Sequence, residues 1–71
     1  MKTGIEHKLA KRLKDLRRKF NFTQEQLAEL SGVDYKHVQL LESKDPPAAR
    51  INTIEKLAGA FKITVSNFLK I

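Results

Sequence analysis

The chain contains no cysteine and no tryptophan, and only three of its 71 residues are glycine and two are proline. The absence of cysteine excludes disulfide bonds and thiolate metal ligands, and it weakly favours an intracellular protein. A domain of this size buries only about 60% of the surface of its unfolded chain, so it is marginally stable. We therefore expect a single domain, residues 1–71, that depends on an efficient helical core or on a partner.

Long apolar segments are also absent. The first twenty residues contain no apolar stretch typical of a secretion signal. No run approaches the ~20 apolar residues that are needed to span a bilayer. Both absences predict a cytoplasmic location.

Residues suited to catalysis or metal binding are scarce as well. The two histidines, His7 and His37, lie thirty positions apart, and no cysteine accompanies either of them. Neither this spacing nor any other grouping of side chains is typical of a zinc site or of nucleophilic catalysis. A glycine-rich phosphate loop is missing too. We therefore expect no enzymatic activity, no metal site and no cofactor.

Positive charge, by contrast, is abundant and lies at one end of the chain. Lys and Arg number 14 against eight acidic residues, which gives a formal net charge of +6. Residues 1–20 hold eight basic and two acidic residues, whereas residues 21–71 hold six of each. This segment favours a polyanionic partner, nucleic acid first and an anionic membrane surface second. A solvated, lysine-rich helix would carry the same charge, so the charge alone does not decide.

The spacing of apolar residues predicts an all-α fold of five short helices, since no segment alternates as a strand does. The first helix is expected over residues 4–19, with Thr3 and Glu6 forming a capping box. Asn21 fits the left-handed residue that commonly ends a helix. The apolar stripe of this helix consists of Ile5, Leu9, Leu13, Leu16 and Phe20.

The last part of the chain predicts two further helices after a loop. Pro46 and Pro47 remove two backbone donors and indicate a loop over residues 43–49. A fourth helix is expected over residues 51–61 and a short fifth over residues 65–69, which Thr64 caps. Their apolar faces are formed by Ile51, Ile54, Leu57, Ala58, Phe61, Val65, Phe68 and Leu69.

Residues 23–42 have the pattern of one amphipathic helix that is interrupted at Gly32. A capping box of Thr23 and Gln26 predicts that a helix begins there. Gly32 supplies the positive φ that ends it, and Asp34 is a good N-cap for a third helix that runs to residue 42. The chain therefore stops one short helix and starts another at once.

Two helices of about two turns, joined by a short turn with glycine, form a helix-turn-helix. Ala28 is small enough to lie where the two helices cross, and Val33 plugs the corner between them. Either Leu30 or Ser31 completes the inner face of the first of the two. The second helix then stands out from the surface, in a shape that fits a major groove about 12 Å wide. The residues expected to pack beneath both helices are Leu27, Val38 and Leu41.

With these parts in place, residues 9–69 resemble the lambda-repressor-like, Cro/XRE-type helix-turn-helix DNA-binding domain. The matching stretches are LKDLRRKFNFTQEQLAELSGV, HVQLLESK and INTIEKLAGAFKITVSNFL. The order of the parts is specific, from the arginine of the first helix through Thr-Gln, Leu-Ala and Gly-Val to the Leu-Glu that closes the third helix. The resemblance implies binding of double-stranded DNA.

The resemblance also implies roles for single residues on the second and third helices. Gln24 would contact a DNA phosphate and support the third helix. Tyr35, Lys36 and His37 would read base edges or contact the backbone, with Lys36 suited to guanine. Leu40 would touch a thymine methyl, unless it is simply an exposed leucine.

Four more positions follow from the resemblance. Arg17 and Glu42 match an ion pair between the first and third helices, which holds the guanidinium near the DNA backbone. Lys44 and Arg50 flank the loop after the third helix and would bind phosphates. The family has a glycine two residues after the acid, but here Ser43 and Lys44 follow Glu42 and that glycine is missing. The loop that follows is also one residue longer than in the family. The phosphate contacts of this loop therefore transfer least well.

We interpret the chain as a small, sequence-specific regulator of transcription of bacterial or phage type. Residues 63–71 are the expected surface of a homodimer that binds a pseudo-palindromic site. An alternative is a protein-interaction module of the same fold, such as an antitoxin that clamps a toxin, and RNA polymerase is a further possible partner. A membrane-surface helix ranks last, because the core needs the narrow apolar stripe of the first helix.

Overall fold

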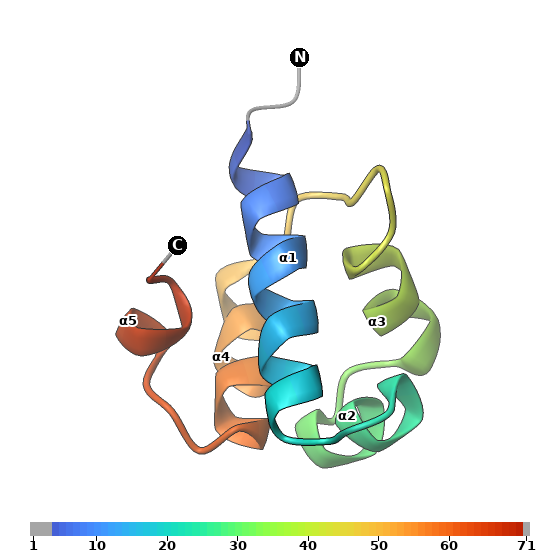
Figure 1. Ribbon diagram of the computed structural model, residues 1–71, viewed down its shortest axis with the longest axis vertical. Helices are drawn as coiled ribbons and strands as arrows, with labels where there is room; N and C mark the ends of the chain where they lie inside the picture. Colours follow the sequence, from blue (N-terminus) through green and yellow to red (C-terminus); the bar gives the residue numbers. More distant parts are fainter. Residues whose placement is uncertain (1–3, 71) are drawn as a thin grey trace.

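The computed structural model describes residues 4–70, and within them it contains five helices and no strand (Figure 1). The helices are α1 (Gly4–Lys19), α2 (Gln24–Ser31), α3 (Tyr35–Leu41), α4 (Ile51–Ala60) and α5 (Val65–Phe68). The all-α class is confirmed, and α1 has the predicted bounds. The last three helices each end one residue earlier than predicted, because Glu42, Phe61 and Leu69 are C-caps.

Most helix ends are formed by the residues that the sequence indicates. The hydroxyl of Thr23 accepts a hydrogen bond from the Gln26 amide at 3.0 Å, and the Gln26 side chain accepts one from the Thr23 amide at 2.8 Å. Gly32 and Asn21 have φ angles of 76° and 58°. Asp34 occupies the N-cap position of α3, but its side chain makes no capping hydrogen bond, so that detail of the prediction is wrong.

Helix caps were also predicted near the two ends of the chain. The hydroxyl of Thr64 accepts a hydrogen bond from the amide of Asn67 at 3.0 Å, so the predicted cap of α5 is confirmed. The capping box predicted for Thr3 and Glu6 involves a residue outside the described range.

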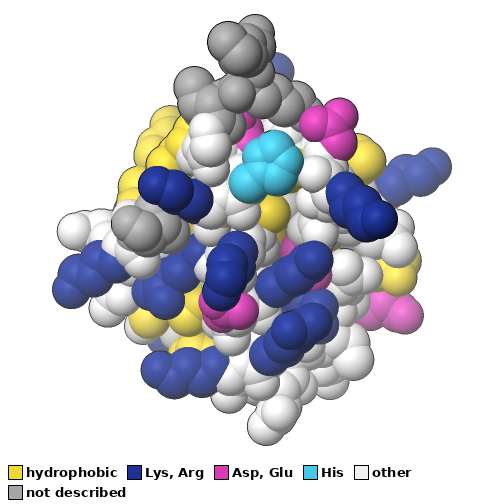
Figure 2. Space-filling view, turned by 45° about the horizontal axis from the view of Figure 1, so that its top comes forward, with side chains coloured by type: hydrophobic (Ala, Val, Ile, Leu, Met, Phe, Trp, Pro, Cys, Tyr) yellow, Lys and Arg dark blue, Asp and Glu magenta, His cyan; other side chains and the backbone are white. Residues whose placement is uncertain are grey.

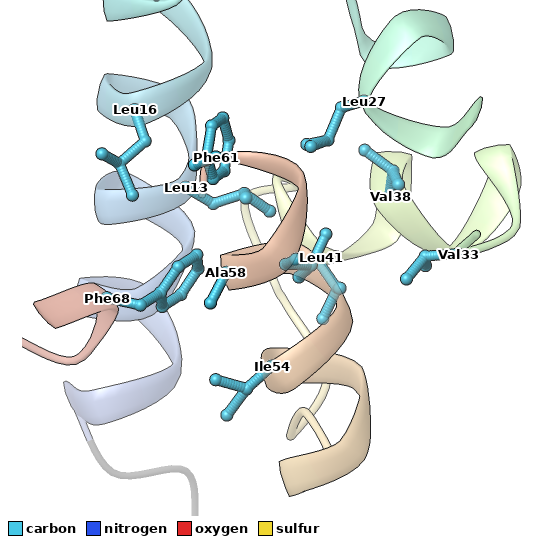
Figure 3. Close-up of a cluster of buried hydrophobic side chains, with 11 residues drawn as sticks. Leu13, Leu16, Leu27, Val33, Val38, Leu41, Ile54, Ala58, Phe61 and Phe68 are labelled. Carbon is cyan, nitrogen blue, oxygen red and sulfur yellow. The ribbon is translucent and has the colours of Figure 1, made fainter. Parts of the chain in front are cut away.

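α1 and α4 form the centre of the molecule, with the α2–α3 pair on one side and α5 on the other (Figure 1). α2 packs against both α3 and α4, and α5 packs against α4. Side chains from all five helices meet in one core (Figure 3). Its buried residues are Leu13, Leu16, Leu27, Val33, Val38, Leu41, Ile54, Leu57, Ala58, Phe61 and Phe68.

Some residues predicted for the core lie at its edge. Ile5 is 53% exposed and Ile51 is 67% exposed, since each lies in the first turn of its helix, before that helix reaches the core. Phe20, just after the end of α1, is partly exposed for the corresponding reason. Phe22 is half-buried and stacks on Phe61, with ring centroids 5.8 Å apart, so the connection into α2 is fixed against α4.

Arg12 of α1 has a structural role that its charge conceals. Its Nε donates a hydrogen bond to the carbonyl of Phe68 at 3.1 Å, and a terminal nitrogen donates to the carbonyl of Asn67 at 2.9 Å. The guanidinium thus satisfies carbonyls at the C-terminal end of α5, where a cation also complements the helix dipole. One of the charges that the sequence assigns to a polyanion therefore holds α5 onto α1.

Candidate nucleic-acid interface

α3 has an inner and an outer side that differ completely in their surroundings. Val38 and Leu41 on the inner side are buried against the other helices. On the outer side Leu40 is 51% exposed, and His37 is half-buried. The four exposed residues of the helix are Tyr35, Lys36, Gln39 and Leu40. They form an outward ridge, hereafter the α3 ridge.

A buried carboxylate fixes the end of α3. Glu42 accepts two hydrogen bonds from the guanidinium of Arg17, from Nε at 2.8 Å and from a terminal nitrogen at 3.0 Å. The other terminal nitrogen of Arg17 donates to the carbonyl of Phe22 at 3.0 Å. The hydrogen bond to Glu42 raises the pKa of Arg17 above its ordinary value. This two-pronged ion pair between α1 and α3 is the arrangement that the family resemblance implies.

The same carboxylate also fixes α2. The side-chain amide of Gln24 donates a hydrogen bond to Glu42 at 3.1 Å, from the first residue of α2 to the C-cap of α3. Glu42 therefore accepts three hydrogen bonds from two other segments, and we call Arg17, Gln24 and Glu42 the Glu42 hub. No buried side-chain nitrogen or oxygen among the described residues lacks a partner.

An open hollow lies beside the Glu42 hub at the start of α2. Its lining includes Arg17, Gln24 and Tyr35, together with the acidic residue Glu25. The first amides of a helix have no partner within the helix, and they favour an anion at this end. Gln24 retains a second amide hydrogen for such a ligand. The first residue of α2, Gln24, and Arg17 therefore border one hollow, which Tyr35 of the α3 ridge also lines.

The turn between α2 and α3 has the predicted construction. Gly32 is left-handed, and its amide donates to the carbonyl of Ala28 at 2.9 Å. Val33 is buried and Ala28 is half-buried against the core. Leu30 is exposed whereas Ser31 is half-buried and accepts a hydrogen bond from the Val33 amide, so Ser31 is the residue that turns inward.

The loop between α3 and α4 begins directly beyond the α3 ridge. Ser43 donates a hydrogen bond from its hydroxyl to the carbonyl of Leu40 at 2.7 Å. The carbonyl of Lys44 lies 3.1 Å from the ring nitrogen Nε2 of His7, which ties the loop to α1. The side chain of Lys44 is exposed, and so is that of Arg50 at the N-cap of α4. Lys44 therefore continues the ridge, whereas Arg50 starts a different element.

The sequence comparison agrees with this geometry. A family model described as Helix-turn-helix matches residues 13–68, well over half of the chain. The chain belongs to this helix-turn-helix family. Its XRE-type resemblance is thereby confirmed, and the chain is a DNA-binding regulator of transcription. Searches of curated proteins and of solved structures gave no significant match.

The basic residues of this helix-turn-helix domain are divided between structure and surface. Figure 2 shows Lys and Arg side chains spread over the face that α1 occupies. Arg12 and Arg17 bind protein groups, and Lys11 pairs with Asp15 at 3.0 Å. Within residues 4–70, no ion pair or hydrogen bond engages the side chains of Lys8, Lys14, Arg18 and Lys19. Part of the net charge therefore remains available to an anionic partner.

Residues 4–70 contain no group of three or more His, Cys, Asp or Glu side chains placed to hold a metal ion. None of their helices is both long and apolar enough to cross a bilayer.

Sequence reasoning missed one exposed member of the α3 ridge. Gln39 lies four residues after Tyr35, so both side chains project from the same face of the helix. The helical period alone would have placed Gln39 beside Lys36 and Leu40, had it been applied to polar residues as well as apolar ones. Arg12 was also missed, but no local signal reveals a bond across 55 or 56 positions.

Proposed function

We propose that the chain binds specific double-stranded DNA sites as a small transcriptional regulator of bacterial or phage type. The observation that carries this proposal is the α3 ridge, which is exposed while the opposite side of the same helix is locked by the core and by the Glu42 hub. A ridge of this kind enters the major groove and presents its first residues to base edges. A cytoplasmic location is part of the proposal, since the target is chromosomal or phage DNA.

Within the groove, two ridge residues have a chemistry suited to a base edge. Lys36 donates to O6 and N7 of guanine, and Leu40 contacts the methyl group of thymine. His37 is half-buried, so its side chain projects less far than those of the ridge residues. We therefore assign it to the DNA backbone and not to a base. Tyr35 faces the hollow at the start of α2 and contacts sugar or phosphate.

The phosphates are bound on both sides of the ridge. On one side, the start of α2 offers its amides, Gln24 and Arg17 to one phosphate. On the other side, Lys44 binds the opposite strand, and Arg50 binds a phosphate further along. Contacts of this type position the protein and supply most of the salt dependence, but they carry little sequence information.

A single domain of this size buries too little surface for tight specific binding, so we propose a homodimer. The predicted surface is residues 63–71; in its described part, residues 63–70, Phe68 is fully buried and Leu69 is the only large exposed apolar residue, so we extend the proposed surface to neighbouring elements. Leu69 borders a mainly apolar groove that Ile5 also lines, and Ile51 is exposed in the first turn of α4. We propose that a second copy covers this surface.

The decisive experiment is selection of bound duplexes from a random DNA pool. We expect a pseudo-palindromic motif with half-sites about one helical turn, or 10–10.5 base pairs, apart. Enrichment of no motif would contradict the proposal, and a motif without two-fold symmetry would contradict the dimer.

A protein-interaction module of the same fold is the second candidate, because the exposed Ile51 and Leu69 would also suit a toxin or a polymerase subunit. Salt separates the two. Binding driven by phosphates weakens steeply between ~50 and ~200 mM salt, by about 0.9 log units per neutralised phosphate for each tenfold rise. A complex held by apolar contacts would change little over the same range.

A further inference from the structure

The α3 ridge contains an internal hydrogen bond. The side-chain amide of Gln39 donates to the hydroxyl of Tyr35 over 3.2 Å, and both residues are exposed. They are four positions apart, one turn of the helix, so the bond runs along the ridge. Lys36 and Leu40, the groove-facing residues of the proposed function, each directly follow one member of this pair in the sequence.

The bond leaves the recognition chemistry of Gln39 intact. A carboxamide has two N–H donors and one carbonyl acceptor, and Tyr35 takes a single donor. The remaining N–H and the carbonyl oxygen form a donor–acceptor edge. Adenine presents the complementary pair in the major groove, an acceptor at N7 and a donor at N6, and glutamine is one of the two side chains that match it with two hydrogen bonds.

The bond also restricts a side chain that would otherwise sample many rotamers. A free glutamine on a surface loses much of that freedom when it binds a base, and the loss weakens binding. The Tyr35 ring is stiff, with two side-chain torsions, and its hydroxyl holds the carboxamide over the outer surface of α3. The cost of ordering Gln39 is therefore met before the DNA arrives.

We propose that Gln39 reads an adenine in each half-site and that Tyr35 is its positioning residue. This inference rests on the proposed function, since it requires the α3 ridge to lie in the major groove. It gives the Tyr35 hydroxyl a partner within the ridge, in place of the phosphate contact described above. Gln39 becomes a determinant of specificity, although the family resemblance assigns it no role.

The test is random-pool selection with the full chain and with five variants. We expect the wild-type chain to select adenine at one position of each half-site. Gln39→Ala should reduce that preference about tenfold and leave the other positions unchanged. Gln39→Glu should move the preference at the same position to cytosine, whose N4 amine donates to a carboxylate.

Tyr35→Phe tests the positioning role, because it keeps the ring and removes the hydroxyl. It should weaken the adenine preference a few-fold at the same position, and it should have no further effect there in the Gln39→Ala background. Both positions are exposed, so folding is checked by comparing the circular dichroism and melting temperature of each variant with the wild-type values. Lys36→Ala is the matched control, since it should alter a different position.

The possible results separate this inference from the proposed function. If the wild-type chain selects a motif and Gln39→Ala changes no position of it, the assignment of Gln39 is overturned while specific binding stands. If Tyr35→Phe acts equally with and without Gln39, the positioning role is overturned. If the wild-type chain enriches no motif, both the function and the inference are overturned.

Discussion

The inner and outer sides of α3, a helix of seven residues, differ in what their side chains contact. On the inner side, Val38 and Leu41 are buried, and the adjoining Glu42 accepts three hydrogen bonds from α1 and α2. On the outer side, the side chains of two ridge residues, Gln39 and Tyr35, bond to each other. The inner side is complete within one chain, so it fixes the position of the helix. The exposed outer side is the one that we propose binds DNA, and we expect its residues to change without loss of the fold.

The largest effect is expected from breaking the inner side. Glu42→Ala leaves the partly buried guanidinium of Arg17 and the amide of Gln24 without their acceptor. We expect the free energy of unfolding to fall by about 3 kcal/mol, as for other buried ion pairs that lose one partner. Urea denaturation of the variant and of the wild-type chain measures this change in the free energy of unfolding. Glu55→Ala, which removes an exposed carboxylate from α4, is the control and should change stability by less than about 0.5 kcal/mol. A similar loss in both variants would show that the Glu42 hub does not fix α3.

The second effect concerns a residue on the outer side. Lys36→Ala removes an exposed side chain, so stability should stay within about 0.5 kcal/mol of wild type. Discrimination at one guanine of each half-site should fall by about 2 kcal/mol, because the bidentate donor is lost. Titrations of labelled duplexes with single substitutions measure this. An equal loss of affinity for every duplex would contradict base reading by α3.

The third prediction tests whether two copies of the domain must associate for the outer side of α3 to bind an operator tightly. Ile51→Lys places a charge in the proposed dimer surface, and we expect operator affinity to fall at least about tenfold while the unfolding of the monomer changes little. Sedimentation velocity should show fewer dimers. Ile51→Leu keeps an apolar side chain and should behave as wild type. Unchanged sedimentation in Ile51→Lys would move the dimer surface elsewhere.

The smallest effect is expected just beyond the ridge. Lys44→Ala should weaken binding to every sequence alike, by less than about tenfold, and should lower the slope of log K against log salt by about one. The exposed Lys56 of α4 provides a matched control, and Lys56→Ala should leave the slope unchanged. Loss of preference at a single base in Lys44→Ala would assign Lys44 to base reading instead.

The sequence predicts the inner side of α3 better than the surfaces around it. Helix bounds, the capping box at Thr23 and the left-handed Gly32 depend on neighbours a few positions away, so local patterns are sufficient. The exposure of Ile5 and Ile51 could not be predicted from local patterns, because it depends on which elements cover the first turns of α1 and α4.

The candidate site was predictable to a different extent. Arg17, Gln24 and Glu42 came from the family resemblance, since no local rule joins residues 18 or 25 positions apart. The contact of Arg12 with the end of α5 joins residues 56 positions apart, and neither a local pattern nor the family resemblance predicts it. Gln39 could be predicted from the helical period, because it lies one turn after Tyr35 on the same face of α3.

The three hydrogen bonds on Glu42 have a mechanical consequence. In the proposed DNA complex, they would hold the phosphate contact of α2 at a set offset from the bases that α3 reads. A duplex whose groove is too wide, or whose two half-sites are out of phase, has to bend or twist to fit. Base pairs that no side chain touches will therefore influence affinity through their stiffness, and flexible steps such as TA or CA at the centre of the site will be favoured.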